Sequence, residues 1–200
     1  MQLRSALVAA VLAGTLYNGW LRFEGRAVHP GDGVLAPEEP LQSNLTAPAP
    51  IRQGRWTLTP RAQYVLTARI LGREDYRFDA LADLVPEDLA LGWGPMSDNR
   101  VLAAFEISQS ARFYSWRPRG ALPIAREDVI SHSANTHVIP ADAQVRSQLA
   151  RLRVGQVVHL EGLLVDAARA DGATARTSLT RSDSGAGACE IMLVESVAVQ

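Results

Sequence analysis

The sequence predicts an α+β protein: an N-terminal transmembrane helix, then one domain with a largely antiparallel sheet and several short helices. Three observations predict this class. The chain begins with an uncharged apolar run, β-branched and aromatic stretches recur after residue 54, and short amphipathic segments lie between them. With 200 residues, of which 47% are hydrophobic, the chain has room for one membrane segment and one globular domain with a proper core.

The first element, residues 1–25, is predicted to be a membrane anchor or a signal peptide. A helix over its apolar run, Ala6–Leu21, would span roughly 24 Å, somewhat less than the roughly 30 Å of the hydrocarbon core. Aromatic residues near its end and arginines after it suit the headgroup level. Because the run lacks a good cleavage site, and Thr15 stands where a lipoprotein would have its cysteine, an uncleaved anchor is favoured over a cleaved signal or a soluble helix.

The anchor predicts a single-pass protein of the bacterial inner membrane, with its C-terminal domain in the periplasm. The tail before the span is too short to hold a domain, and N-terminal signal anchors commonly export a large C-terminal domain. Counting only arginines on the two sides favours the opposite orientation. All 20 basic residues are arginine, which indicates the GC-rich coding bias of many bacteria.

The next segment, residues 26–53, is predicted to form a proline-rich spacer. Its prolines fix φ and stiffen an extended chain. Such a segment is expected to hold the following domain away from the bilayer. Residues 54–200 are predicted to form that α+β globular domain.

Strands and helices are predicted in turn along the domain. Alternating or β-branched stretches predict strands over residues 56–59, 64–71, 111–116, 156–165, 174–179 and 190–199. Capping residues, prolines and apolar positions at helical spacing predict helices over residues 87–91, 99–105, 123–131 and 141–152. The Asp171-Gly172 turn favours an antiparallel meander of the last three strands, packed with helices on one face.

Charge and cysteine content exclude several classes of function. The formal net charge is −1 at pH 7, so the domain has no overall basic field and no nucleic-acid partner is predicted. The single cysteine, Cys189, excludes an intramolecular disulfide and a cysteine-rich zinc site. No cofactor is predicted. The expected partners are the membrane, through the single N-terminal span, and a protein of the cell envelope.

The candidate chemistry lies in a thiol and a polar cluster that are far apart in the sequence. An imidazole beside the thiol would take its proton so that the sulfur attacks an acyl carbon, and a third polar group would orient the ring. The candidate catalytic residues are Cys189, His132, His137 and Asn135, with Asp142 as a second candidate for orienting the imidazole. This set predicts a cysteine-nucleophile hydrolase or transpeptidase.

Structural interpretations of the same residues compete with catalysis. Cys189 alternates with Ile191 and Leu193, which is typical of a small residue buried in a sheet core. The acidic pair Glu87 and Asp88 is interpreted as a solvent-exposed helix start and not as an acid–base pair.

A metal site is the remaining alternative. His132 and His137 are five residues apart, so a regular helix or strand points them in different directions. Only a loop would bring them together, with His159 and Glu161 as further ligands. Four dispersed histidines lack a recognised ligand spacing, and no metal is predicted.

Four strings of sequence resemble an uncharacterised family of bacterial single-span membrane-anchored proteins. The strings are REDYRFD (73–79), LALGWGPMSD (89–98), HSANTHVIPAD (132–142) and LTRSDSGAGACE (179–190). The resemblance covers most of the chain. It implies a membrane anchor and a bacterial origin, and it assigns no activity and no catalytic residue.

The sequence therefore favours a membrane-anchored extracytoplasmic domain that binds or scaffolds in the bacterial cell envelope. The alternative is the enzyme that uses Cys189 with His132 or His137. The two differ in where the sulfur lies: beside an imidazole in an open cleft for the enzyme, and among isoleucine and leucine side chains for the binding domain.

Overall fold

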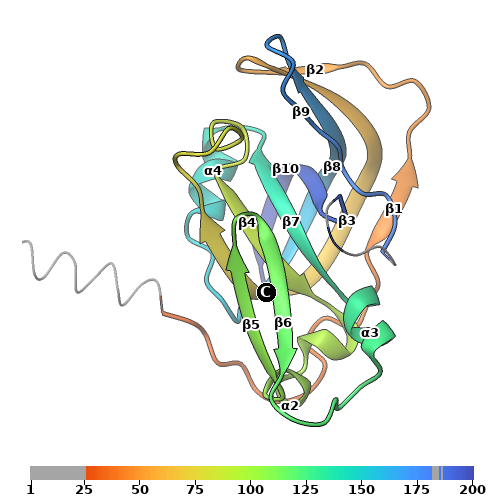
Figure 1. The fold of residues 1–200 in the computed structure, drawn as a ribbon, viewed down its shortest axis with the longest axis vertical. Coiled ribbons are helices and arrows are strands. Elements are labelled where there is room, and N and C mark those ends of the chain that lie inside the picture. Colours follow the sequence, from red (N-terminus) through yellow and green to blue (C-terminus); the bar gives the residue numbers. More distant parts are fainter. Residues whose placement is uncertain (1–25, 182–184, 186) are drawn as a thin grey trace, which may run out of the picture.

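A computed structural model of the chain describes residues 26–181, 185 and 187–200. The predicted anchor, Ala6–Leu21, lies outside these residues. Within them, no helix combines the length and the apolar character that crossing a bilayer requires. The described part is a mixed α+β domain, mostly sheet with a few short helices, so this coarse prediction is confirmed (Figure 1).

Five strands close into a barrel. In sequence order they are β3 (Trp56–Asp75), β4 (Glu87–Gly92), β7 (Ser133–Pro140), β8 (Val157–Arg169) and β10 (Glu190–Val199). Around the barrel the order is β3-β4-β7-β10-β8, and β8 pairs with β3 to close the ring. Neighbouring strands are antiparallel except for β7 and β10, which are parallel.

The connectivity of the barrel corresponds to a known topology. If the barrel strands are numbered one to five along the chain, their order around the ring is 1-2-3-5-4. A helix, α4 (Ala143–Leu149), connects the third strand to the fourth. This is the strand order of the OB-fold, a five-stranded Greek-key barrel that typically binds ligands on the face of its second and third strands. Here those strands are β4 and β7.

The segment 26–53, expected to be an extended spacer, lies along the domain instead. It contributes two short strands, β1 (Leu41–Asn44) and β2 (Ile51–Gln53), which pair with β3 on the edge opposite β8. β4 occupies that edge only from Arg69 onward. The two short strands therefore satisfy backbone groups of β3 that would otherwise be left at an open sheet edge.

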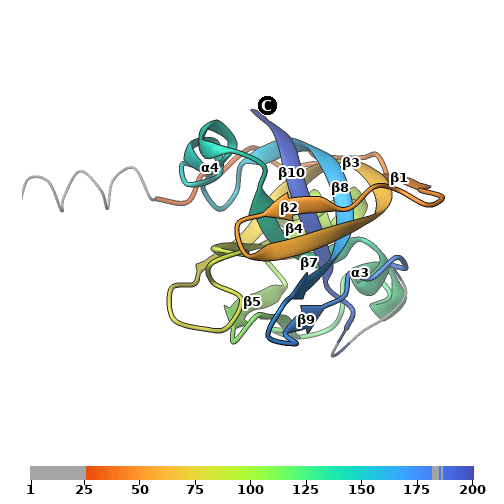
Figure 2. The same cartoon turned by 90° about the horizontal axis from the view of Figure 1, so that it is seen from above.

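A hairpin inserted between β4 and β7 covers the outer side of the barrel. Its strands are β5 (Phe105–Ser110) and β6 (Phe113–Pro118), and they form a separate two-stranded sheet. Figures 1 and 2 show the hairpin lying outside β4 and β7. A third hydrophobic cluster, which includes Phe105, packs beneath it.

The barrel interior holds the main hydrophobic core. Side chains from all five barrel strands point inward, and α4 adds Val145 and Leu149. The buried barrel residues include Tyr64, Leu66, Ile70, Leu89, Leu91, Val138, Leu160, Leu164, Met192 and Val194. Alternate residues of β7 and β10 point outward, where Ile139, Ile191 and Leu193 form part of a second cluster. The strands near this cluster are therefore covered on both faces.

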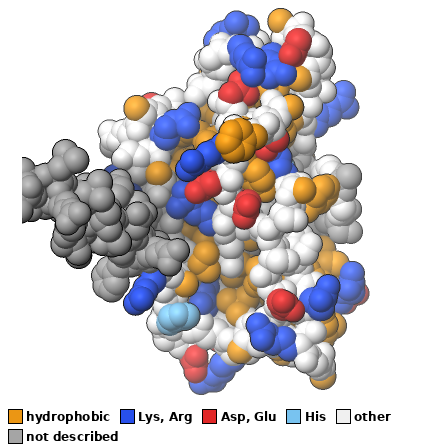
Figure 3. Space-filling model, turned by 60° about the vertical axis from the view of Figure 1, so that its left-hand side comes forward, with side chains coloured by type: hydrophobic (Ala, Val, Ile, Leu, Met, Phe, Trp, Pro, Cys, Tyr) orange, Lys and Arg blue, Asp and Glu red, His pale blue; other side chains and the backbone are white. Residues whose placement is uncertain are grey.

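The surface carries mixed charge. Figure 3 shows acidic and basic side chains interspersed over one face of the domain. Several arginines form exposed ion pairs, such as Arg55 with Asp83 at 2.6 Å. Pairs of this kind contribute little to stability. On the face shown, there is no extended basic patch of the kind that binds a polyanion.

The helix predicted over residues 87–91 is wrong, because these residues form β4. All six residues of β4 are buried, and its two edges are paired with β3 and β7. A strand that is covered on both faces does not alternate between apolar and polar residues, so periodicity does not distinguish it from a short buried helix. Tertiary pairing decides its conformation.

The other three predicted helices are present in shortened form. Asp98 caps α2 and Asp142 caps α4, each by accepting a hydrogen bond from a backbone N–H group in the first turn. The three helices are α2 (Asn99–Leu102), α3 (Arg126–Ser131) and α4.

The predicted meander of the last three strands is also wrong. β9 (Thr174–Ala175) has only two residues and pairs with β8. β10 has the predicted bounds but lies on the other edge of β8, where it also pairs with β7. This placement closes the barrel and leaves β10 without an open edge along the paired residues.

The close approach of β8 and β10 yields the first prediction. A Cβ atom at Gly162 would lie 2.0 Å from the backbone oxygen of Leu193. We expect Gly162→Ala to lower the free energy of unfolding by about 1–3 kcal/mol, because backbone must move to admit the methyl group. The matched control is Gly120→Ala, where no atom lies within 4 Å of the added carbon. Urea unfolding of both variants measures the difference, and equal stabilities would contradict the packing described.

Candidate functional site

A row of polar side chains on the outer face of β4 and β7 forms the candidate site. Asp88 on β4 and His137 on β7 are direct partners in the antiparallel pair, so their side chains emerge on the same face. Asn135 emerges on that face two residues earlier in β7. Their neighbours Leu89 and Val138 belong to the barrel core. Strand alternation thus places the polar row immediately outside the core.

Asp88 is a fully buried carboxylate with charged partners, its side chain being 0% exposed. Its Oδ1 accepts hydrogen bonds from Nδ1 of His137 at 2.7 Å and from Nη1 of Arg112 at 3.2 Å. Its Oδ2 accepts one from the amide of Asn135 at 3.3 Å. A buried carboxylate requires such partners, because an unpaired charge in the interior carries a large desolvation penalty.

His137 connects this carboxylate to the thiol. Burial alone would lower the pKa of His137, but the hydrogen bond with Asp88, the proximity of Cys189 and the charges of both raise it to about 9. The imidazole is therefore a cation at neutral pH. Because Nδ1 is bonded to Asp88, Nε2 is the nitrogen available to Cys189.

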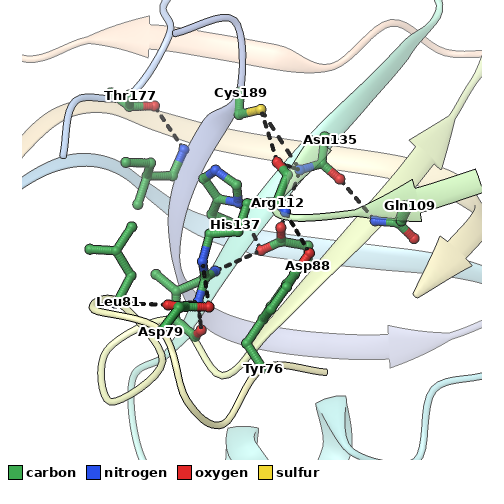
Figure 4. Close-up of polar contacts among 12 residues, drawn as sticks. Tyr76, Asp79, Leu81, Asp88, Gln109, Arg112, Asn135, His137, Thr177 and Cys189 are labelled. Carbon is green, nitrogen blue, oxygen red and sulfur yellow. Dashed lines mark hydrogen bonds and ion pairs between the residues drawn. The ribbon is translucent and has the colours of Figure 1, made fainter. Parts of the chain in front are cut away.

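Cys189 lies immediately before β10, and the parallel pairing of β10 with β7 brings it to the polar row. Its sulfur lies 3.7 Å from Nδ2 of Asn135 and 3.9 Å from the carbonyl oxygen of Arg112 (Figure 4). The residue is half-buried, and it lines a pocket of about 340 Å³. The thiol therefore lies beside the polar row and is accessible from a cavity.

Arg112 joins the β5–β6 hairpin to the site. It occupies the hairpin turn with Ala111, at φ values of 67° and 49°, which are left-handed and unfavourable for residues other than glycine. Its guanidinium forms ion pairs with Asp79 at 2.8 Å and with Asp88 at 3.2 Å. These contacts help to hold the turn in its strained conformation.

The loop between β3 and β4 completes the wall around the guanidinium. The carbon of the Arg112 guanidinium lies 4.1 Å from the ring centroid of Tyr76, and the Tyr76 hydroxyl accepts a hydrogen bond from the Arg112 backbone N–H at 2.9 Å. Burial, followed by the nearby charge of Asp88, raises the pKa of Tyr76 to about 12, so the phenol stays neutral. Figure 4 shows the barrel face, the hairpin turn and this loop meeting at Arg112.

The structure brings three of the four predicted catalytic residues together. Cys189, His137 and Asn135 share one site, although residues 135 and 189 are 54 positions apart. His132 makes its contacts elsewhere. It is the C-cap residue of α3, and its Nε2 pairs with Glu39 at 3.1 Å. Of the two candidate histidines, His137 is therefore the one that shares the site with the thiol.

Asp88 and Arg112 are the site residues that sequence reasoning missed. Asp142, one candidate for orienting the imidazole, caps α4. Asp88 takes the orienting position, although it was expected to be exposed at a helix start. The apolar run Leu89–Leu91 that follows it indicates burial, but it does not distinguish a strand from a short helix. Arg112 gives no such signal, because an Ala-Arg turn is unusual for a two-residue hairpin.

The histidines do not form a metal centre in the part of the chain that the structure describes, where no cluster of three or more His, Cys, Asp or Glu side chains is arranged to bind an ion. His159 on β8 contacts the Thr67 hydroxyl at 2.9 Å and Glu161 at 3.0 Å. The site is thus best described by its thiol, imidazole and carboxylate.

The raised pKa of His137 yields the second prediction. Because the pKa of His137 is higher in the folded state, protonation of its imidazole stabilises that state. This contribution is complete below pH 6.5, the pKa of the unperturbed imidazole, and it is lost as the pH rises through the folded value of about 9. We expect the loss to be on the order of 3 kcal/mol in the free energy of unfolding. Urea unfolding between pH 6 and pH 10 measures it, and NMR titration of the imidazole gives the pKa itself.

Two variants test the cause. In Asp88→Asn the titration of His137 should move to lower pH, because the carboxylate partner is gone. The matched histidine control is His159→Gln, which removes an imidazole outside the site and should retain the pH dependence. A His137 midpoint near 6.5 in the unmodified protein would contradict the described contacts.

No protein-family model and no curated protein matches the chain, and no solved structure matches it either. The strand order of the barrel identifies a topology, and topology alone does not assign a function. The functional argument therefore depends on the geometry around Cys189.

Proposed function

We propose that the domain is a cysteine-nucleophile acyl hydrolase or acyl transferase that uses Cys189, His137 and Asp88. One observation carries this proposal. His137 hydrogen-bonds Asp88 at 2.7 Å through Nδ1 and lies close enough to Cys189 for that residue to raise its pKa, and the side chain of Cys189 lines an open pocket. A nucleophile, a base and a group that orients the base form the arrangement shared by many acyl-transfer enzymes.

The proposed reaction begins with the thiolate of Cys189 and the imidazolium of His137. The sulfur attacks the acyl carbon of an ester, thioester or amide, and a C–S bond forms. As the bond to the leaving group breaks, that group takes the proton from Nε2 of His137. Water or an acceptor amine then attacks the thioester carbonyl and gives a proton to the neutral imidazole. The C–S bond breaks, its electron pair returns to the sulfur, and the acid or amide product leaves, which restores the thiolate and the imidazolium.

In this proposal Asp88 orients the imidazole of His137 and favours its protonated form. Its hydrogen bond fixes the proton on Nδ1 and leaves Nε2 for the sulfur and the leaving group. Its negative charge favours the imidazolium, which carries the proton that the leaving group takes. A positioned acid or base of this kind typically contributes about 10²–10⁴-fold to a rate.

Asn135 is assigned a positioning role. Its Nδ2 lies within hydrogen-bond reach of Asp88 and of the Arg112 carbonyl oxygen, at 3.3 and 3.1 Å. Its Oδ1 accepts a hydrogen bond from Gln109 on β5 at 2.9 Å. The side chain therefore ties the barrel strand to the hairpin beside the sulfur, and has little capacity left to bind a substrate oxyanion.

The envelope-binding role, the membrane anchor and the periplasmic location stay predictions from the sequence, as does the resemblance to membrane-anchored bacterial proteins. They are compatible with an enzyme in the same compartment. A purely binding domain, however, needs no imidazole beside its only thiol. We therefore favour the enzyme over a purely binding domain.

Turnover of an activated ester tests the proposed function. With p-nitrophenyl butyrate, we expect a burst of p-nitrophenol equal to the amount of protein and a thioester adduct on Cys189 in the mass spectrum of the acid-quenched sample. Cys189→Ala should abolish both, and His137→Asn should slow acylation by about 10²–10⁴-fold.

The matched histidine control is His132→Gln, which should leave the burst unchanged because His132 pairs with Glu39 outside the site. Correct folding of each variant is checked by its urea unfolding curve. A burst that survives in Cys189→Ala, or the absence of any adduct with the folded protein, would rule out Cys189 as the nucleophile.

A further inference from the structure

We infer that the pocket beside Cys189 binds a compact, uncharged acyl group, either a single aromatic ring or a short aliphatic chain. This inference rests on the proposed acyl transfer and adds its substrate class. The pocket begins at the nucleophile, so the group attached to the attacked carbonyl is the one that enters it. Its walls, its charge and its size each support the assignment.

The walls come from three elements around the sulfur. Tyr114 and Trp116 of β6 form one side, and Ser133 and Asn135 of β7 form another. Ile130 of α3 adds an aliphatic surface between them. Trp116 is held in place by an edge-on contact with Phe105, the ring centroids being 5.6 Å apart. Aromatic rings held in this way offer a rigid apolar surface to a ligand.

Apart from the sulfur of Cys189, which the proposed reaction uses as a thiolate, no charged side chain lines the pocket among the residues that the structure describes. Arg112 directs its guanidinium to Asp79 and Asp88, and Arg126 stacks on the ring of Trp116 at 5.1 Å without lining the cavity. An anionic acyl group would therefore lose its hydration without gaining an ion pair, which is unfavourable.

Three of the polar side chains in the walls, Tyr114, Ser133 and Asn135, are already paired. The Tyr114 hydroxyl donates to Oγ of Ser133 at 3.3 Å, and that hydroxyl donates to the carbonyl oxygen of Val129 at 2.7 Å. Burial raises the pKa of Tyr114 to about 12, so its hydroxyl is neutral at physiological pH. The walls thus present few unsatisfied donors to a polar or charged substrate.

The volume limits the size of the group. At about 340 Å³, the pocket lies near the lower end of the range of roughly 300–1,000 Å³ that small-molecule sites occupy. A single ring or a short chain fits this volume together with the reacting carbonyl. A long acyl chain would have to extend beyond the pocket into solvent.

Alkylation of the thiol tests the pocket independently of turnover, because the chain has only one cysteine. The probes are iodoacetanilide and 4-(iodoacetamido)benzoate, which differ by one carboxylate on the ring that would enter the pocket. Relative to the urea-unfolded chain, the folded protein should prefer the neutral probe by at least about tenfold. Equal preference in the folded and unfolded states would overturn the inference.

A matched pair of variants, one charged and one uncharged, can be made at the rim of the pocket. Ser115 is an exposed residue of β6 that lines the pocket. Ser115→Arg should reduce the preference for the neutral probe several-fold, because it supplies a partner for the carboxylate, and Ser115→Gln of similar length should not. An unchanged preference in Ser115→Arg would show that the carboxylate does not approach this wall, and would overturn the placement of the ring.

Failure of this inference and failure of the proposed function give different results. Selective alkylation without any ester turnover would retain the pocket and reject acyl transfer. Turnover that is equally fast for p-nitrophenyl butyrate and for the p-nitrophenyl monoester of succinate would retain acyl transfer and reject the neutral pocket.

Discussion

The buried carboxylate of Asp88 is the group on which the arrangement of the site depends. It lies on the wall of the barrel with no exposure to solvent, so its charge requires partners that are also withdrawn from water. One partner, His137, comes from the neighbouring strand, and the other, Arg112, comes from the tip of an inserted hairpin. The same carboxylate therefore charges the imidazole and fixes the hairpin over the barrel face.

This coupling explains why the hairpin turn tolerates a strained backbone. A two-residue turn with left-handed φ values normally contains glycine or asparagine, and here it contains Ala111 and Arg112. The guanidinium of Arg112 forms ion pairs with both Asp79 and Asp88 while it stacks on Tyr76. The free energy of these contacts offsets the strain, and the turn carbonyl comes to lie beside the Cys189 sulfur.

The sequence predicted those features that depend on local pattern. The bounds of β10 and the positions of three helices follow from alternation, capping and apolar spacing. It also supplied Cys189, His137 and Asn135 as a candidate set, because few residue types carry out acyl-transfer chemistry. It missed Asp88, since the role of that residue depends on pairing between β4 and β7, and it did not choose between His132 and His137. The role of Asp88 and the choice between the two histidines both depend on long-range strand register, which no local pattern encodes.

The barrel topology and the hairpin together explain how a binding face becomes an enclosed site. In an OB-fold barrel, the outer face of the second and third strands is a common place for ligands. Here β5 and β6 lie over that face. A pocket that Trp116 and Cys189 both line remains beside the sulfur. Covering the face also withdraws Asp88 and His137 from water, which strengthens their interaction. The insertion that restricts access to the site is therefore also what withdraws the carboxylate and the imidazole from water, an environment that suits the acyl transfer proposed for Cys189.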